Sequence, residues 1–308
     1  MGSVVISIDA ELGWGFHDLD EPTVRLVEAS REGWKTLLDL LSEYQIPATW
    51  AVVGHLFLEE CDGRHADHPT PPGWFDREQG EWKDRPDLRF GGSLITKLLN
   101  ADVGHDVGSH SFSHVVFDDP RITREIVAAE LAAAADAADR YGVEFESFVF
   151  PRNAVGYRDV LADAGYTVYR GERIQPSAGV ARSVDKLARA IDPDRVRLVE
   201  PYVDEYGLVD VPPSLFLFGF EGVPRTVVES VWADPMVRQA KHGIDRASRD
   251  DGVFHIWLHP SQLVSERDVR RVRAVLEHVD RRRRDSGLAV ETMADVAKRL
   301  SVSTATHS

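Results

Sequence analysis

The feature that most constrains the fold is a repeated alternation of short apolar runs, rich in β-branched residues, with longer amphipathic segments. The apolar runs predict strands at 4–9, 48–54, 106–110, 147–151, 167–171, 208–211 and 253–259. The amphipathic segments predict helices at 24–44, 123–142, 158–165, 226–249 and 265–286. Apolar strands that alternate with such helices indicate a parallel sheet covered by helices.

Polar residues at the ends of the predicted strands favour a barrel over an open sheet. They are Asp9 and Glu11 after the first strand, His110 and His114 after the third, Arg152 and Asn153 after the fourth, and His259 after the last. In a (β/α) barrel the chemistry collects at the C-terminal ends of the strands. We therefore expect an α/β fold, a distorted barrel of roughly seven or eight β/α units, as a single domain over residues 1–308.

One segment, at about 58–93, is too rich in Pro, Gly, Asp and Trp and too long to be a plain connector. We interpret it as an insertion in the barrel that reaches over the site. Trp74 and Trp82 would then offer flat surfaces to a substrate. The alternative is a decorated surface loop with its tryptophans packed beneath it.

Composition limits the partners. A formal net charge of −15 and a pI near 5.2 argue against nucleic acids and anionic membranes, which such a field repels. The chain has no apolar run long enough to span a membrane and does not start with a basic segment followed by an apolar one, so we expect a cytoplasmic protein. The preference for Arg over Lys and for Asp over Glu is typical of proteins from a high-salt cytoplasm. The sequence does not decide whether the protein forms a homo-oligomer.

Cysteine usage narrows the kind of metal site. Cys61 is the single cysteine, which excludes an internal disulfide and a thiolate-rich metal site. A metal would therefore need histidine and carboxylate ligands, and we interpret Cys61 as an ordinary loop residue.

Such ligands occur after the third and first predicted strands. His110 and His114 are four residues apart, which places two imidazoles on the same side of a helical turn, although pairs at this spacing are also common on surface helices. Glu11 supplies a third ligand, and two histidines with one carboxylate leave one face of an ion open for water and substrate. Asp9 lies two residues before Glu11 and therefore points to the same side, where it could take a proton from metal-bound water.

Four motifs, SIDAE, HSFSH, FPRN and WLHP, follow one another between residues 4 and 260. In type and order they resemble the motifs of the polysaccharide deacetylase family, also called the NodB-homology family or carbohydrate esterase family 4. The resemblance implies the distorted barrel of the NodB and glycoside hydrolase/deacetylase type. It also implies one divalent metal ion, with zinc preferred and cobalt, manganese, nickel or iron as alternatives, on Glu11, His110 and His114.

The same resemblance implies the catalytic roles. Asp9 is similar to the family's catalytic base, Arg152 to the arginine that orients this base, and His259 to the general acid. A backbone N–H near Asn153 would stabilise the oxyanion. The implied reaction is removal of an N-acetyl group from a sugar or glycan precursor, by general acid/base attack of metal-bound water on the acetamido group.

Three departures from the family pattern keep alternatives open. The first motif reads Asp-Ala-Glu instead of two adjacent aspartates, which resembles a branch that contains cytoplasmic deacetylases and also allantoinase-like hydrolases of cyclic amides or imides. FPRN replaces a more usual Arg-Pro-Pro motif, and LVDVPPS offers Asp210 either as a support for His259 or as a turn residue. A barrel that binds glycans without catalysis is the third hypothesis.

Overall fold

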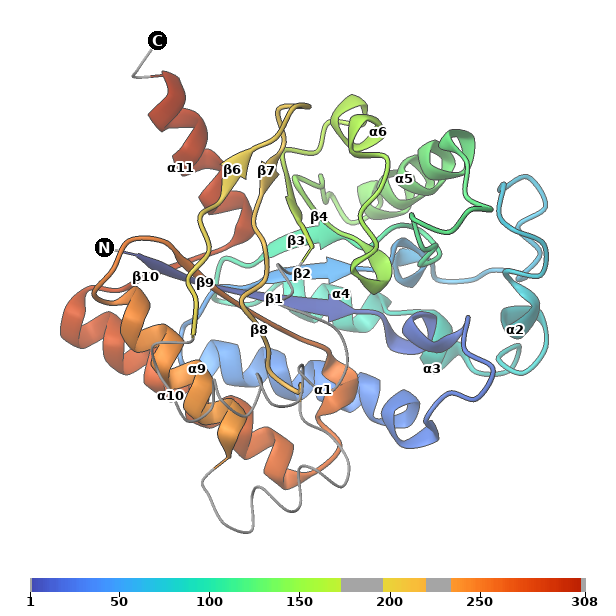
Figure 1. The fold of residues 1–308 in the computed structure, drawn as a ribbon. Coiled ribbons are helices and arrows are strands. Elements are labelled where there is room, and N and C mark those ends of the chain that lie inside the picture. Colours follow the sequence, from blue (N-terminus) through green and yellow to red (C-terminus); the bar gives the residue numbers. More distant parts are fainter. Residues whose placement is uncertain (1, 173–195, 220–233, 306–308) are drawn as a thin grey trace, which may run out of the picture.

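The computed structural model describes residues 2–172, 196–219 and 234–305 (Figure 1). Its strands are β1 (Ser3–Ala10), β2 (Thr49–Val52), β3 (Asp106–Ser109), β4 (Ser147–Val149), β5 (Val168–Arg170), β6 (Tyr202–Val203), β7 (Val209–Asp210), β8 (Leu215–Phe216), β9 (Val253–Leu258) and β10 (Ala289–Glu291). Its α-helices are α1 (Val24–Glu43), α2 (Asp76–Gln79), α3 (Pro86–Arg89), α4 (Gly92–Leu99), α5 (Arg124–Asp139), α6 (Arg158–Asp163), α9 (Pro235–Ala247), α10 (Glu266–Ser286) and α11 (Met293–Ala305). Short 3₁₀ turns are η1 (Leu12–Phe16), η2 (Gly54–Phe57), η3 (Pro151–Asn153) and η5 (Pro260–Gln262).

The strands form one curled sheet in the order β6-β7-β5-β4-β3-β2-β1-β9-β8, with β10 beside the start of β1. Its pairs are parallel except for β6 with β7. Residues between β7 and β8 lead the chain from one end of this order to the other: the Val211 N–H donates to Tyr169 in β5, and the Ser214 N–H donates to His255 in β9. The result is the expected distorted barrel, built as a half-barrel with a parallel core.

Burial explains why the strands lack an alternating pattern. All eight residues of β1 are buried, because helices cover the outer face of the sheet while the inner face is filled by the barrel interior (Figure 1). On the outer face, Trp34 of α1 stacks on Trp50 of β2 with ring centroids 5.3 Å apart. Helices α9 and α10 lie side by side on the same flank of the sheet (Figure 1).

The helix boundaries follow local capping chemistry. The hydroxyl oxygen of Thr123 accepts from the Ile126 N–H at the start of α5, and Gly142 beyond its end has φ +68°. Ser265 and Asp268 form a capping box at the start of α10. The predicted helices at 24–44, 123–142, 158–165 and 265–286 are confirmed to within a few residues.

Other parts of the prediction need correction. The helix predicted at 226–249 is described only from Asp234, its N-cap, and residues 226–233 lie outside the described ranges. Each of the seven predicted strands is present, but the short strands β6, β8 and β10 and the helix α11 were not predicted. The segment at 58–93, here called the insertion, contains the short helices α2 and α3, the start of α4 and several buried side chains, so it is folded. None of the helices in the described ranges is long and apolar enough to cross a membrane.

Candidate active site

Two carboxylates enter the site from the end of β1. Asp9 is the last but one residue of the strand, and Glu11 follows it directly. Both face His259, which comes directly after β9: its Nε2 lies 3.6 Å from Asp9 Oδ2 and 3.7 Å from Glu11 Oε1. The two acids therefore share one side, as the strand pattern predicted.

Two histidines meet the same glutamate from the end of β3. Glu11 Oε1 lies 3.1 Å from Nε2 of His110 and 3.2 Å from Nε2 of His114. The expected helical turn between them is absent, because Ser111 and His114 have φ values of +60° and +63°. A loop with a tight reversal therefore brings the imidazoles together.

The orientation of His110 shows what this cluster requires. Its Nδ1 lies 2.7 Å from the carbonyl oxygen of Val149, which can only accept, so Nδ1 carries the hydrogen. A neutral His110 then presents the lone pair of Nε2 to the carboxylate of Glu11, and only a proton or a cation between them makes this contact attractive. An imidazole whose second nitrogen donates to a backbone carbonyl is also the usual form of a metal-bound histidine. The residues present therefore fit a divalent ion on Glu11, His110 and His114, the group that also meets the distance requirement for a metal site.

Electrostatics keep both acids ionised. Burial raises the pKa of Glu11, but the positive field of His259 and the contacts with His110 and His114 outweigh it and hold the pKa well below its usual value. Burial also acts against ionisation of Asp9, and here the guanidinium of Arg170 outweighs it, so that the pKa of Asp9 is lowered. Asp9 is therefore a carboxylate at neutral pH.

Arg170, at the end of β5, holds Asp9 in place. Its Nη1 donates to Asp9 Oδ1 at 2.6 Å and its Nη2 to Oδ2 at 2.7 Å. Nη2 also donates to Oδ1 of Asn153 at 2.8 Å, and Nη1 to the hydroxyl of Ser7 at 3.0 Å. His255 completes this buried group, with Nε2 2.8 Å from the same hydroxyl.

The expected role of Arg152 is therefore wrong, and Arg170 takes its place. Arg152 follows β4 in a turn where its own φ is +58°, and its guanidinium donates to Asp18 and, at 3.0 Å, to the carbonyl of Gly15. Asp18 and His17 lie close to His114, so Arg152 lies at the rim of the histidine cluster and away from Asp9.

The two supporting residues also differ from expectation. The backbone N–H of Asn153 already donates to Phe150 at 2.9 Å, so it is no free donor for an oxyanion, and Asn153 contributes through its side chain instead. Asp210 accepts from the N–H of Gly171 at 3.1 Å, and burial raises its pKa to about 6. It does not hold His259, whose Nδ1 is buried without a hydrogen-bond partner in the described part of the chain.

The two tryptophans of the insertion have different environments. Trp82 is 2% exposed and packs with Phe16 and Leu88 in a small core, so it cannot offer a surface to a substrate. Trp74 is partly buried, and its Nε1 donates to both oxygens of Ser113 at 3.0 Å. Because Ser113 precedes His114, Trp74 lies beside the cluster.

Sequence reasoning missed a buried acid that shapes the histidine loop. Glu130 of α5 is fully buried, and its carboxylate accepts from the N–H of Ser113 at 2.8 Å and from the hydroxyl of Ser113 at 2.6 Å. A charged residue on the apolar face of a predicted helix was the available signal. For Arg170, the signal was a charged residue at the end of an apolar strand, as at the other predicted site positions.

The fold and the site define a class of protein: a curled (β/α) barrel that gathers two acids and three histidines at the C-terminal ends of its strands. The polysaccharide deacetylase family model matches residues 20–169. This match contains His110 and His114, whereas Asp9, Glu11 and His259 lie outside it and join the histidines in the folded structure. No curated protein gives a significant sequence match.

Solved structures agree in fold. A protein from Mycobacterium smegmatis assigned to the polysaccharide deacetylases aligns with a TM-score of 0.64 at 14% identity, over 98% of this chain and 91% of that one. One from Pseudomonas aeruginosa PAO1, assigned to the same group, gives 0.60 at 10% identity over 96% and 89%. Puue allantoinase also gives 0.60, at 11% identity over 96% and 89%. Over residues 20–169 the chain is similar to the polysaccharide deacetylase family, and this similarity supports an enzyme with deacetylase activity.

Proposed function

We propose that the protein is a metal-dependent hydrolase that removes the N-acetyl group from an N-acetylated sugar or glycan precursor. The observation that carries this proposal is the convergence of Glu11, His110 and His114 on one point beside Asp9 and His259. The match to the polysaccharide deacetylase family model supports deacetylation as the chemistry, and an acetamido group is the substrate feature that this chemistry needs.

Glu11, His110 and His114 would hold the metal ion, for which zinc fits two imidazoles and one carboxylate well. When bound, such an ion lowers the pKa of water and polarises a carbonyl. Two protein ligands are imidazoles whose Nε2 atoms already face Glu11, so little rearrangement is needed to form the site.

The side chains of the protein would manage the protons. Asp9 takes a proton from the attacking water, and Arg170 fixes the direction of its carboxylate through the two-point contact. His259, with Nε2 3.6 Å from Asp9, donates a proton to the amide nitrogen as the C–N bond breaks. The products are acetate and a free amine, with no covalent enzyme intermediate.

The side chains of the site differ in their exposure to solvent. His110, His114 and Arg170 have side chains that are at most 1% exposed, whereas His259 is 21% exposed. We infer that the substrate approaches from the side of His259, which suits a residue that must reach the leaving nitrogen.

Acetate release from N-acetylhexosamine conjugates tests the proposal. We expect zinc-loaded protein to release acetate, and chelation to abolish the release. His114→Ala should lose both zinc and activity, whereas Asp9→Asn should keep zinc and lose about 10²- to 10⁴-fold in kcat. Asp136→Asn, an exposed change on α5, is the matched control and should leave both unchanged.

Two outcomes would replace the proposal. Turnover of cyclic ureides without acetate release would assign the same residues to hydrolysis of a cyclic amide. Protein that binds no divalent ion, and whose glycan binding is unchanged by His114→Ala, would indicate a glycan-binding barrel without catalysis.

A further inference from the structure

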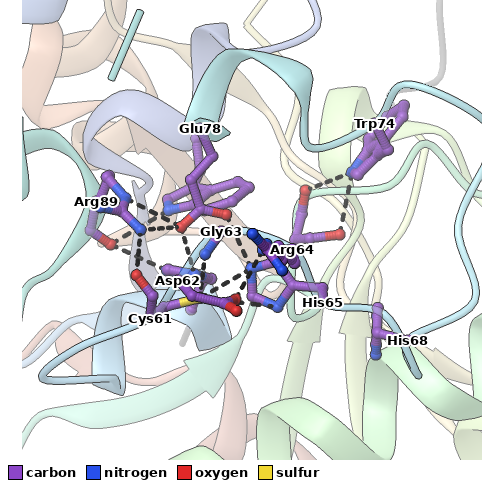
Figure 2. Close-up of polar contacts among 12 residues, drawn as sticks. Cys61, Asp62, Gly63, Arg64, His65, His68, Trp74, Glu78 and Arg89 are labelled. Atoms are coloured by element: carbon purple, nitrogen blue, oxygen red, sulfur yellow. Dashed lines mark hydrogen bonds and ion pairs between the residues drawn. The ribbon is translucent and has the colours of Figure 1, made fainter. Parts of the chain in front are cut away.

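A second cluster of metal-ligating side chains lies in the insertion, apart from the active site. It consists of His55, Cys61, His65 and Glu78, whose potential ligand atoms all lie within 4.8 Å of one another. His55 is in η2, which begins two residues after the end of β2, and Glu78 is in α2, so the cluster joins the barrel to the insertion. Figure 2 shows Cys61, His65 and Glu78 gathered at one place, with Arg89 against Glu78.

His55 is oriented as a ligand. Its Nδ1 lies 3.1 Å from the carbonyl oxygen of Arg89, which can only accept, so Nδ1 carries the hydrogen. Its Nε2 lies 3.0 Å from Glu78 Oε1, and the side chain is completely buried. As for His110 and Glu11, a ring nitrogen that presents its lone pair to a carboxylate requires a proton or a cation between the two groups, and a bound metal ion meets this requirement.

Cys61 and His65 form the second half of the cluster. The sulfur of Cys61 lies 3.2 Å from Nε2 of His65, four residues along the chain. The N–H of Gly63, which has φ +77°, donates to this sulfur at 3.2 Å. Such a backbone donor stabilises a thiolate, the form in which cysteine binds metal.

Glu78 has one oxygen available for an ion. Its Oε1 accepts from Nε and Nη2 of Arg89 at 3.0 and 2.8 Å, which fixes the carboxylate from outside the cluster. Its Oε2 lies 2.8 Å from Nε2 of His65, inside the cluster. A metal-binding carboxylate is commonly held by a partner of this kind.

We propose that His55, Cys61, His65 and Glu78 bind one structural Zn²⁺ ion, in addition to the metal expected in the active site. Zn–S and Zn–N bonds of about 2.3 and 2.0 to 2.1 Å set the ligand atoms of a tetrahedral site roughly 3.3 to 3.6 Å apart. The contacts of His65 Nε2 with Glu78 Oε2, at 2.8 Å, and with the sulfur of Cys61, at 3.2 Å, are slightly shorter than this, and all four ligand atoms lie within 4.8 Å of one another. Four protein ligands leave no open position, which is typical of a structural site.

The proposed ion would fix the insertion beside the active site. Trp14, three residues after Glu11, lies against His55 with ring centroids 4.4 Å apart, and its Nε1 donates to the carbonyl of Arg89. Phe112, between the two active-site histidines, contacts the rings of both His55 and His65. We expect loss of the ion to loosen the insertion without removing an active-site ligand.

Cobalt gives a test that separates the two sites. Because Cys61 is the single cysteine, a thiolate-to-Co²⁺ charge-transfer absorption in the near ultraviolet can come only from the proposed site. We expect metal-free protein to develop this band, which should reach full intensity by two equivalents of cobalt, when both sites are filled. Cys61→Ser should abolish it, His65→Ala should weaken binding about tenfold or more, and His114→Ala should keep the band. Zinc content should be two equivalents in the unchanged protein and one in either Cys61→Ser or His114→Ala.

His68→Ala is the matched control, because His68 lies in the same loop but pairs with Glu130 outside the cluster. It should keep the band at full strength. Absence of the band in the unchanged protein would overturn the proposal, as would a band that His65→Ala and His55→Ala leave unaltered, since the thiol would then bind cobalt alone. Failure of the active-site proposal would appear instead as unchanged zinc content in His114→Ala, with the band intact.

Discussion

Arg170 and Asp9 form a two-point ion pair inside the barrel, with side chains that are 0% and 4% exposed. The pair comes from β5 and β1, which are separated by three strands in the sheet, so it spans the barrel interior. A buried charge is stable only while its partner is present. Arg170 therefore contributes both to stability and to the direction of the Asp9 carboxylate.

Arg170→Gln should lower the free energy of unfolding by about 3 to 5 kcal/mol, because it leaves Asp9 buried without its counter-charge. Urea denaturation monitored by circular dichroism measures this loss. Arg152→Gln is the matched control: Arg152 is 37% exposed in its pair with Asp18, and its loss should cost at most about 1 kcal/mol. Equal losses for the two variants would contradict the assignment of Arg170 as the partner of Asp9.

His255 should make stability depend on pH. Burial lowers the pKa of His255 to about 3, and the nearby Arg170 acts in the same direction. The unfolded chain, with a pKa near 6.5, binds this proton first as the pH falls. Stability is therefore fully present above about pH 6.5 and falls with decreasing pH toward 3, by at most about 1.4 kcal/mol per pH unit for this group.

Urea midpoints between pH 4 and 7 test this dependence. His255→Gln removes the titrating group, so the slope of stability against pH should be shallower than in the unchanged protein. Slopes are compared because the variant also loses the contacts of His255 with Ser7 and Val211 and will be less stable at every pH. Parallel slopes would show that His255 is not buried in its neutral form.

The strands and the convergence of Glu11, His110 and His114 could be predicted from the sequence because both follow from local patterns. Apolar runs mark buried parallel strands, and parallel strands bring their C-terminal ends to one edge, so Glu11 and His110 had to lie near each other. The side chain of Glu11 also had to share a side with Asp9, because residues two apart on a strand face the same way.

The sequence could not predict in the same way which arginine pairs with Asp9 across the barrel. Arg152 lies three residues past the end of β4 and Arg170 is the last residue of β5, and the sequence does not show which of them reaches Asp9. Arg152 sits in a turn with positive φ that directs it toward Asp18. Likewise, nothing in a loop rich in Pro and Gly distinguishes the buried Trp82 from the partly exposed Trp74.

Glu130 should control metal affinity although it is no ligand. Glu130→Gln replaces one acceptor oxygen with an amide that faces the donors of Ser113, so the loop before His114 must shift. We expect zinc affinity at the active site to fall by about 10- to 100-fold. Competition with a chromophoric chelator measures the change, in a Cys61→Ser background that removes the second proposed site. Asp136→Asn on the same helix is exposed and should have no effect, and an unchanged affinity in Glu130→Gln would show that Ser113 does not position His114.

Gly15→Ala should displace the side chain of Glu11, because a Cβ at this position would lie 1.9 Å from Oε2 and 2.6 Å from Cδ of Glu11. The carboxylate is the end of a flexible side chain, so Gly15→Ala should fold, but with Glu11 displaced from His110 and His114. We expect active-site zinc affinity to fall by about tenfold or more, as for loss of a group that orients the ligands. Gly104→Ala is the matched control, because a Cβ there meets no atom within 4 Å. Zinc affinities that stay equal in the two variants, with both proteins folded by circular dichroism, would mean that Glu11 does not bind the metal.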